Sequence, residues 1–223
     1  MESLRPILYP LGLLPLIPFA LRFWVQWIYS ERLGRSAVPR LFWQLSLLGN
    51  LLLCLHYFIQ VQFPFALVQA IAAVISWRNL DLMKPAARLT MRKTLTLAAT
   101  ATALLTIAFA VQGWLTVGHL DWVRTPVKLW DTTPAAKYPL PWHILGGVGA
   151  GLFASRFWLQ WWEAERHQRS TLSRAFWWLS ISGSLLSLAY FLRIGDTVGI
   201  CNYAFGLIPA VRNLMLLARR KAA

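Results

Sequence analysis

RFWVQWIYSERLGRSAVPRLFWQLSLLGN, residues 22–50, occurs twice in this chain in closely similar form. It returns 134 positions later, without a gap, as RFWLQWWEAERHQRSTLSRAFWWLSISGS, residues 156–184. The match continues to the RNL triplets that begin at Arg78 and Arg212, and about 21 of the 59 aligned positions are identical. Charged, amide and aromatic positions coincide as well as apolar ones, so shared hydrophobicity does not explain the match. The chain therefore contains an internal duplication.

The duplicated stretch lies among apolar runs that are long enough to cross a membrane. The chain is 57% hydrophobic and only 13% charged, with a mean hydropathy of +0.50, whereas about a quarter of the residues of a soluble domain are charged. A hydrocarbon core about 30 Å thick needs about 20 apolar residues in a helix. This composition excludes a disordered chain and argues against a soluble enzyme. Seven segments qualify as spans: 6–29, 38–59, 62–80, 94–117, 142–163, 173–193 and 197–217.

The duplication and the number of spans together predict a topology. Each copy contains three spans, and a single span links the copies, so both copies have the same orientation in the membrane. We therefore expect an all-α membrane protein of seven helices arranged 3+1+3. The first repeat would comprise residues 1–83, the linking helix and an outer loop residues 84–141, and the second repeat residues 142–223. Trp122 and Trp130 are expected to hold the outer loop at the membrane surface.

The basic residues predict the orientation of the chain. The formal net charge is +14, from 22 Lys and Arg against 8 Asp and Glu. Most cations lie in short clusters between the apolar runs, 13 on one side and five on the other. This bias places the amino terminus outside and the carboxyl terminus in the cytoplasm. The same clustering argues against a nucleic-acid partner.

Four arginines fall inside predicted spans, and Arg22 and Arg156 lie deepest. About ten residues separate each from the basic loops, which corresponds to roughly 15 Å of membrane depth. An arginine there costs at least ~2.5 kcal/mol and is a functional candidate, the alternative being a side chain that snorkels to the interface. Gln26 and Gln160 follow four residues later on the same helical face. Guanidinium and amide donors on one face suit a phosphate or carboxylate, while helix–helix hydrogen bonding is the alternative for the glutamines.

The third span of each copy ends in a second duplicated pair: Arg78 with Asn79, and Arg212 with Asn213. These residues are expected either to line the cytoplasmic side of a binding site or to contact lipid headgroups, where snorkelling is cheap. Glu31 and Glu165, in the matching loops ERLGRS and ERHQRS, are candidates to pair with Arg78 and Arg212 respectively. A solvated loop that only sets topology is the alternative for these glutamates.

The two copies also differ at polar positions: His56 aligns with Tyr190, Asn50 with Ser184, and Tyr29 with Glu163. Such differences are expected if one asymmetric substrate lies between the halves. Glu163 follows Arg156 by seven residues and is a candidate to neutralise it. A histidine within a span is more often a packing residue than a ligand contact.

Motif searches find a packing motif and no catalytic one. The run GGVGAG contains the GxxxG spacing of Gly147 and Gly151, which usually marks a helix-packing face. Phosphate-binding loops, nucleophile elbows, HExxH zinc motifs and paired carboxylates in the spans are all absent from the sequence, and its two cysteines lack CxxC spacing. The sequence therefore predicts no catalytic residue, metal site or cofactor.

The pattern RFxxQWxxxERxxRSxxPxxFWxLSLLGxxLLL…RNL resembles the lipid A biosynthesis amino-terminal domain family, in both copies, 22–80 and 156–214. The second copy departs from the pattern at Ser173, where the first has Pro39. Modules of this family accompany lipid-A-disaccharide synthase or stand alone in bacterial membranes. The resemblance implies glycolipid metabolism at the inner membrane, with the catalytic step in a separate glycosyltransferase domain.

The 3+1+3 plan is also similar to SWEET and PQ-loop transporters, in which the third helix of each bundle packs between the first two. We therefore expect a transporter or flippase for an anionic glycolipid, either a polyprenyl-phosphate-linked sugar or a lipid A intermediate. The duplicated arginine and glutamine pairs would hold its phosphate between the bundles, and its tail would stay among membrane lipids. A subunit that presents lipid to a glycosyltransferase is the alternative function, and a small-sugar transporter is a third.

Overall fold

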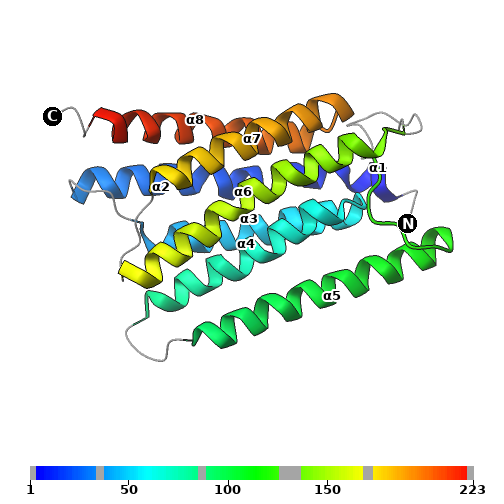
Figure 1. Cartoon of the computed structure of the whole chain (residues 1–223), viewed down its shortest axis with the longest axis horizontal. Helices are drawn as coiled ribbons and strands as arrows, with labels where there is room; N and C mark the ends of the chain where they lie inside the picture. Colours follow the sequence, from blue (N-terminus) through cyan, green and yellow to red (C-terminus); the bar gives the residue numbers. More distant parts are fainter. Residues whose placement is uncertain (1–3, 34–37, 85–88, 126–136, 168–172, 220–223) are drawn as a thin grey trace. The chain divides into compact units, whose positions relative to one another are not determined.

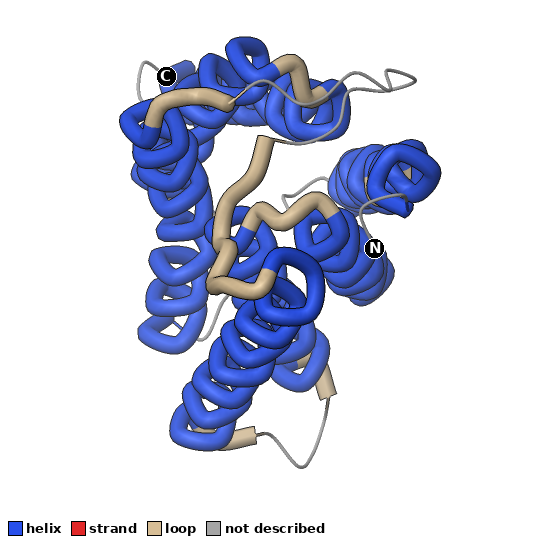
Figure 2. The backbone as a smooth tube through the Cα atoms, turned by 90° about the vertical axis from the view of Figure 1, so that its right-hand side faces the viewer, coloured by secondary structure: helices blue, strands red, loops and turns tan. Residues whose placement is uncertain are grey.

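The structure is a computed structural model that describes residues 4–33, 38–84, 89–125, 137–167 and 173–219. These residues are mostly helical (Figures 1 and 2), which confirms the all-α fold class for this part of the chain. The helices are α1 (Leu4–Leu8), the 3-10 helix η1 (Tyr9–Leu13), α2 (Leu16–Leu33), α3 (Arg40–Ile59), α4 (Phe63–Leu82), α5 (Met91–Val117), α6 (Leu140–His167), α7 (Arg174–Ile194) and α8 (Thr197–Arg219).

Several of these helices can cross a membrane, as predicted for a multi-pass membrane protein. Within the described residues, five segments are long and apolar enough: Arg5–Gln26, Arg40–Ile59, Phe63–Leu82, Met91–Val117 and Arg174–Ile194. The other two predicted spans coincide with α6, of 28 residues, and α8, of 23 residues. The count of seven spans and the 3+1+3 layout stay predictions.

The first predicted span is broken near its start, where α1, η1 and α2 follow one another. Pro10 and Pro15 lack the amide hydrogen that an uninterrupted α-helix uses. Leu14 N instead donates to Leu11 O (3.1 Å), the shorter bonding pattern of a 3-10 helix. The break places Gly12 against the ring of His56 on α3.

The chain divides into two compact units, Met1–Lys137 and Tyr138–Ala223. In the first unit α3 packs against both α2 and α4, and α5 packs against α4. In the second unit α7 packs against both α6 and α8. The second helix of each repeat is therefore its central element. This order differs from the one that the SWEET and PQ-loop likeness implies, and that architecture is not confirmed.

The first two helices of each repeat approach closely at matched glycines. A Cβ atom on Gly49 would lie 2.6 Å from Phe19 Cε1, and one on Gly183 would lie 2.7 Å from Phe153 Cα. Small residues allow this close approach in membrane helices. The packing faces of α2 on α3 and of α6 on α7 are therefore equivalent. A second matched pair of glycines faces a ring in each repeat: Gly12 against His56 and Gly146 against Tyr190.

The start of the segment that follows α5 is tied to the turn between α3 and α4. Phe63 N donates to Trp122 O (2.9 Å), and the two rings meet edge to face with centroids 5.1 Å apart. Arg5 Nη2 donates both to Gln60 O in the same turn (3.1 Å) and to Thr125 O in the loop (3.2 Å). These contacts support a structural role for this part of the loop. Trp130 lies outside the described residues.

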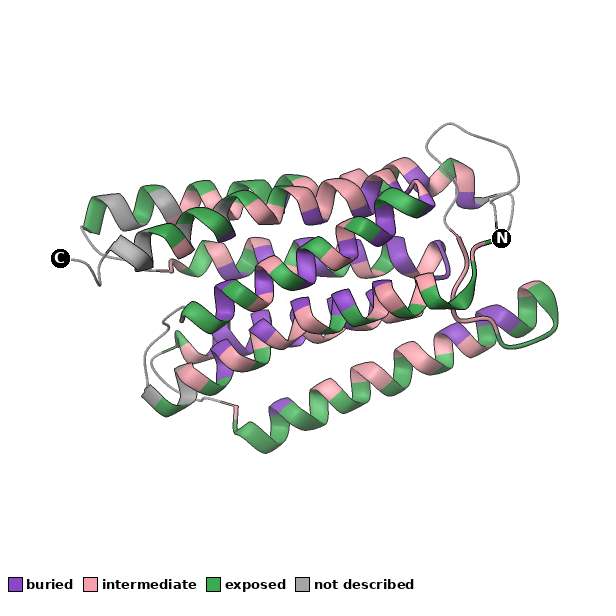
Figure 3. Ribbon diagram, turned by 45° about the horizontal axis from the view of Figure 1, so that its top comes forward, coloured by how far each residue is buried: buried purple, intermediate pink, exposed green. Residues whose placement is uncertain are grey.

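Burial differs sharply between neighbouring helices of the first unit (Figure 3). In α4, 61% of the most apolar stretch of 18 residues is buried, compared with 11% of the corresponding stretch of α5. Leu104, Ile107 and Leu115 of α5 are more than half exposed, at 63%, 59% and 77%. Exposed apolar surface of this extent is typical of contact with a membrane.

Candidate functional site

The two deep arginines make the same hydrogen bond in both repeats. Arg22 Nη1 on α2 donates to Ser46 Oγ on α3 (3.2 Å), and Arg156 Nη1 on α6 donates to Ser180 Oγ on α7 (3.2 Å). Each serine hydroxyl in turn donates to the carbonyl four residues earlier, at 2.8 Å from Ser46 and 2.7 Å from Ser180. The serine is thus oriented by its own helix, so that its lone pairs face the arginine.

Three phenylalanine rings surround each of these guanidinium groups. Arg22 Cζ lies 4.6 Å from the centroid of Phe19, 5.0 Å from that of Phe23 and 5.6 Å from that of Phe42. The matched rings of the second repeat lie 3.4, 4.6 and 5.6 Å from Arg156 Cζ. Cations over aromatic faces are attracted electrostatically, and more strongly when water is excluded. We refer to each arginine with its serine and three rings as an arginine cage.

The two cages differ in burial and in the glutamine beside them. Arg156 is 7% exposed and Gln160 is 1% exposed, whereas Arg22 and Gln26 are only half-buried. Neither side-chain polar atom of Gln160 has a hydrogen-bond partner among the described residues. A buried amide without partners costs about 1–3 kcal/mol. The second cage therefore carries unused donor and acceptor capacity next to its cation.

On α3 and α7, the polar residue four positions after the cage serine also differs between the repeats. In the first, Asn50 Nδ2 donates to Ser76 Oγ on α4 (3.3 Å). In the second, Ser184 stands in place of Asn50 and Ala210 in place of Ser76. Ser184 is fully buried, and its hydroxyl has no hydrogen-bond partner among the residues that the structure describes. The second unit thus leaves polar atoms unsatisfied where the first satisfies them.

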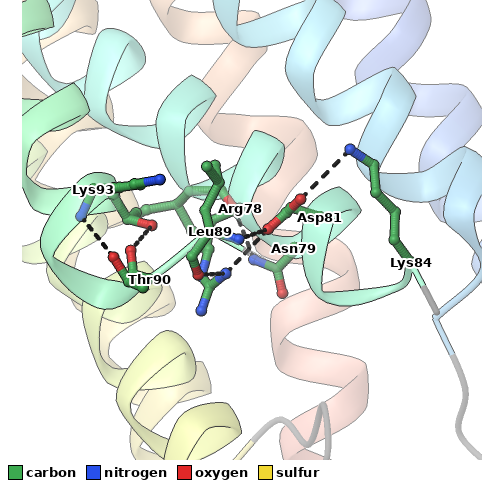
Figure 4. A network of polar contacts seen from close by, with 9 residues as sticks. Arg78, Asn79, Asp81, Lys84, Leu89, Thr90 and Lys93 are labelled. Atoms are coloured by element: carbon green, nitrogen blue, oxygen red, sulfur yellow. Dashed lines mark hydrogen bonds and ion pairs between the residues drawn. The ribbon is translucent and has the colours of Figure 1, made fainter. Parts of the chain in front are cut away.

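Arg78 belongs to a polar network at the end of α4 (Figure 4). Its Nη1 donates to Asp81 Oδ2 (3.2 Å) and to Leu89 O (2.6 Å), while Leu89 N donates to Asp81 Oδ2 (2.6 Å). Lys84 Nζ adds a contact to Asp81 Oδ1 (3.4 Å). The buried Arg78–Asp81 pair thereby ties the end of α4 to the segment that leads into α5. The amide of the adjacent Asn79 donates to Ile75 O within its own helix (2.9 Å).

The matching position in the second repeat has a different environment. Arg212 is exposed on α8, and Met215 stands where the first repeat has Asp81. Position 215 therefore cannot supply the carboxylate that Asp81 supplies to the clamp in the first repeat. Duplication in the sequence therefore does not mean equal burial in the structure. Three predicted partners have side chains outside the described part of the chain, so their contacts stay predictions: Glu31, Glu165 and Asn213.

His56 and Tyr190 pack against a residue of the first helix of their repeat. The Tyr9 and His56 rings meet edge to face at 5.3 Å, and the His143 and Tyr190 rings at 5.7 Å. His143 Nδ1 also lies 2.8 Å from Tyr190 Oη. Positions 9 and 143 align with each other, so the repeats contain the same pair of residue types in exchanged places. Each repeat therefore keeps one tyrosine and one histidine in contact, although the two residue types have exchanged positions.

The remaining acidic candidate lies on α6. Glu163 is half-buried, and its Oε2 has no hydrogen-bond partner among the described residues. Within those residues, no group of three or more His, Cys, Asp and Glu side chains could hold a metal ion. The cage arginines and the glutamines beside them supply each unit with a fixed cation and hydrogen-bond donors, which suit an anionic oxygen.

The sequence alone did not identify Ser46 and Ser180 as the hydrogen-bond partners of the two deep arginines. Ser46 and Ser180 are themselves identical in the alignment, and their phenylalanine neighbours repeat as well. These identities could have indicated that the serines and phenylalanines surround the duplicated arginines. The Asp81 clamp, by contrast, is marked by a difference, because RNLDL in the first copy becomes RNLML in the second. A combined site formed by Arg22 and Arg156 stays a prediction, since each cage is described within its own unit.

Comparison with known proteins identifies relatives for the whole chain. The Lipid A Biosynthesis N-terminal domain family matches residues 11–81 and 145–215, so the predicted tandem resemblance is confirmed. The chain is 37% identical over 214 residues to Lipid-A-disaccharide synthase of Chlamydia felis and 35% identical over 214 residues to that of Chlamydia abortus. Both matches cover 96% of this chain but only 34% of the relative, so the chain spans about a third of these proteins. No solved structure matches it.

Proposed function

We propose that this chain, which belongs to the Lipid A Biosynthesis N-terminal domain family, is the membrane part of a lipid A synthase system that holds an anionic glycolipid precursor. In this proposal the chain presents the lipid to a glycosyltransferase, and the transfer chemistry belongs to that partner. The names of the relatives supply the lipid class. The chain's own contribution is binding and orientation in the bacterial inner membrane, with a periplasmic amino terminus and a cytoplasmic carboxyl terminus.

The observation that carries the proposal is the cage of the second repeat. Arg156 is a buried cation, and Gln160 lies four residues away with no partner for its amide. Residues four apart share one face of a helix, so guanidinium and amide can approach the same oxygen atoms. Phosphate and carboxylate accept such charge-assisted hydrogen bonds strongly. A phosphorylated headgroup would use the polar capacity that the protein leaves unused, while its acyl chains remain in lipid.

The first cage would act as a second, more accessible contact. Arg22 is half-buried, and its Nε has no hydrogen-bond partner among the described residues. Its Nη1 is already oriented by Ser46. A preorganised guanidinium loses little rotamer freedom when it binds an anion. Arg78 and Arg212 remain candidates for contacts nearer the cytoplasmic surface.

Lipid binding provides the first test. The protein would be purified in mild detergent, and co-purifying lipid identified by mass spectrometry. We expect an anionic glycolipid, with its binding affinity reduced at least tenfold by Arg156→Gln, because one charge-assisted hydrogen bond to a ligand is worth about 1.5–3 kcal/mol. Arg166→Gln, on the exposed end of the same helix, serves as the matched control. Equal occupancy in the two variants would refute the proposed site.

The partner claim needs a separate experiment. The chain would be co-expressed with lipid-A-disaccharide synthase from the same cells and isolated by a tag on either protein. A stable complex whose synthase activity on membrane-embedded substrate depends on the chain would support presentation. Unchanged activity in its absence would exclude that role without affecting the lipid-binding result.

The duplicated three-span unit favours a second candidate, translocation of the bound glycolipid. Parallel repeats of this kind are one of the plans on which transporters are built, with rocking of one bundle against the other. The cargo would be a lipid A intermediate or a polyprenyl-phosphate-linked sugar. Movement of a labelled lipid across vesicles that contain only this protein would support translocation, and its absence together with lipid binding would favour presentation.

A further inference from the structure

A groove between α7 and α8 lies outside the cages and has no role in the proposed function. Its volume is about 340 Å³, and both helices are neighbours in the second unit (Figure 1). We propose that this groove binds one acyl chain of an anionic phospholipid from the surrounding bilayer, with the phosphate at Arg174. The lining residues are Arg174, Trp178, Val211, Leu214 and Met215.

The lining of the groove combines the two kinds of surface that such a lipid presents, one for a charged headgroup and one for an acyl chain. Arg174 is the first residue of α7, at the end of the membrane-spanning segment. Trp178 follows one turn later on α7 and is 58% exposed. Tryptophan side chains are enriched at membrane interfaces, near the ends of spanning helices. The α8 side of the groove is apolar, formed by Val211, Leu214 and Met215. The groove therefore places one cation beside apolar side chains, which suits a phosphate and the acyl chain attached to it.

The floor of the groove is firmly packed. Leu214 contacts a buried cluster of Phe176, Trp177 and Ala210, which joins α7 to α8. The groove therefore has a fixed base and an open side. An acyl chain entering from the bilayer needs no helix to move. A site of this kind costs little ordering free energy when it binds.

Charge distinguishes this groove from the surface of a random helix pair. Neither α7 nor α8 contains an Asp or Glu residue, and Arg174 is the charged residue among those that line the groove. Basic pockets between membrane helices are known binding places for anionic headgroups. A zwitterionic lipid would gain less from this arrangement, because its own cation would face Arg174.

The first repeat provides an internal control, since it has the same helices without the same groove lining. Its counterparts of Val211 and Met215 are Trp77 and Asp81. An indole would occupy part of the space that valine leaves open, and a carboxylate would repel a phosphate. The Asp81 carboxylate is moreover engaged by Arg78 and Leu89. The lipid site is therefore expected in the second repeat alone.

The test compares phosphatidylglycerol with phosphatidylcholine as probes, by native mass spectrometry of the full chain in detergent. We expect tighter binding of phosphatidylglycerol. Arg174→Gln and Met215→Asp should each weaken its binding about fivefold, because one basic residue near an anionic membrane surface contributes about 1 kcal/mol. Val211→Trp should weaken both lipids, because it fills the groove without changing charge. Arg40→Gln, the matched position of the first repeat, should change nothing.

Three outcomes would overturn the inference: no preference for phosphatidylglycerol, an equal loss in Arg40→Gln, or unchanged binding in Val211→Trp. Val211 and Met215 are 42% and 62% exposed, so their variants should fold, which circular dichroism would verify. Co-purifying glycolipid would be measured in the same samples. Its retention in a variant that has lost phosphatidylglycerol separates this site from the proposed function, on which the inference does not depend.

Discussion

Replacement of Asp81 by methionine should lower the free energy of unfolding by about 2–3 kcal/mol, the cost of leaving charged and hydrogen-bonded groups without their acceptor. The variant reproduces the sequence of the second repeat at this position. It removes the acceptor of Arg78 Nη1 and Leu89 N, both of which lie within 3.2 Å of Asp81 Oδ2. Unfolding by sodium dodecyl sulfate, followed by circular dichroism, would measure the change.

Two further variants separate charge from hydrogen bonding in this clamp. Asp81→Asn keeps an oxygen acceptor for Leu89 N but removes the charge, so its loss should be intermediate. Lys84→Met should change stability by less than about 0.5 kcal/mol, because exposed ion pairs contribute little, and the Lys84 side chain is 45% exposed. An Asp81→Met protein as stable as the parent would show that the clamp does not stabilise the first unit.

Replacement of Gly183 by alanine should destabilise the second unit by about 2–3 kcal/mol, the cost of overpacking a close helix contact. The added Cβ would lie 2.7 Å from Phe153 Cα and 2.8 Å from Phe153 Cβ. Backbone atoms cannot rotate away as a flexible side chain can. Helices α6 and α7 must therefore separate, which would also disturb the Arg156–Ser180 hydrogen bond between them.

Gly147→Ala is the matched control on α6, since a Cβ there would meet no atom of a neighbouring described residue within 4 Å. We expect its thermal stability in detergent to equal or slightly exceed that of the parent, because alanine favours helix. Similar destabilisation in both variants would indicate a general effect of glycine replacement and contradict the proposed contact. Because the cage of Arg156 spans α6 and α7, Gly183→Ala should also weaken binding of the lipid precursor more than Gly147→Ala does.

The positions of the helices could be predicted from apolar length alone. The predicted span 173–193 corresponds to α7 at Arg174–Ile194, and the predicted span 62–80 to α4 at Phe63–Leu82. Long apolar runs must satisfy their backbone hydrogen bonds internally in a membrane, so helix is dictated wherever the run is long enough. The break at η1 was missed, although Pro10 and Pro15 mark it, because run length ignores missing amide donors.

The packing glycines could not be identified from spacing. The GxxxG pair Gly147 and Gly151 predicts a packing face, but a Cβ on either would meet no atom of the described residues within 4 Å. The structure uses Gly146 and Gly149, which face Tyr190 and Ser187. Which side of α6 meets α7 depends on the rotation of the helix about its axis. Every side chain on the two helices contributes to that rotation, so a local motif does not specify it.

The amino-acid sequence alone determined the duplication, the helical class, the family and the list of duplicated cations, because each follows from composition or from aligned identity. Only the tertiary structure decided how those cations are used. It placed Arg22 and Arg156 in matching cages with serines 24 residues away. It also enclosed Arg78 while leaving Arg212 exposed. The environment of a charge is created by neighbours on other helices, and those neighbours are known only once the helices are packed.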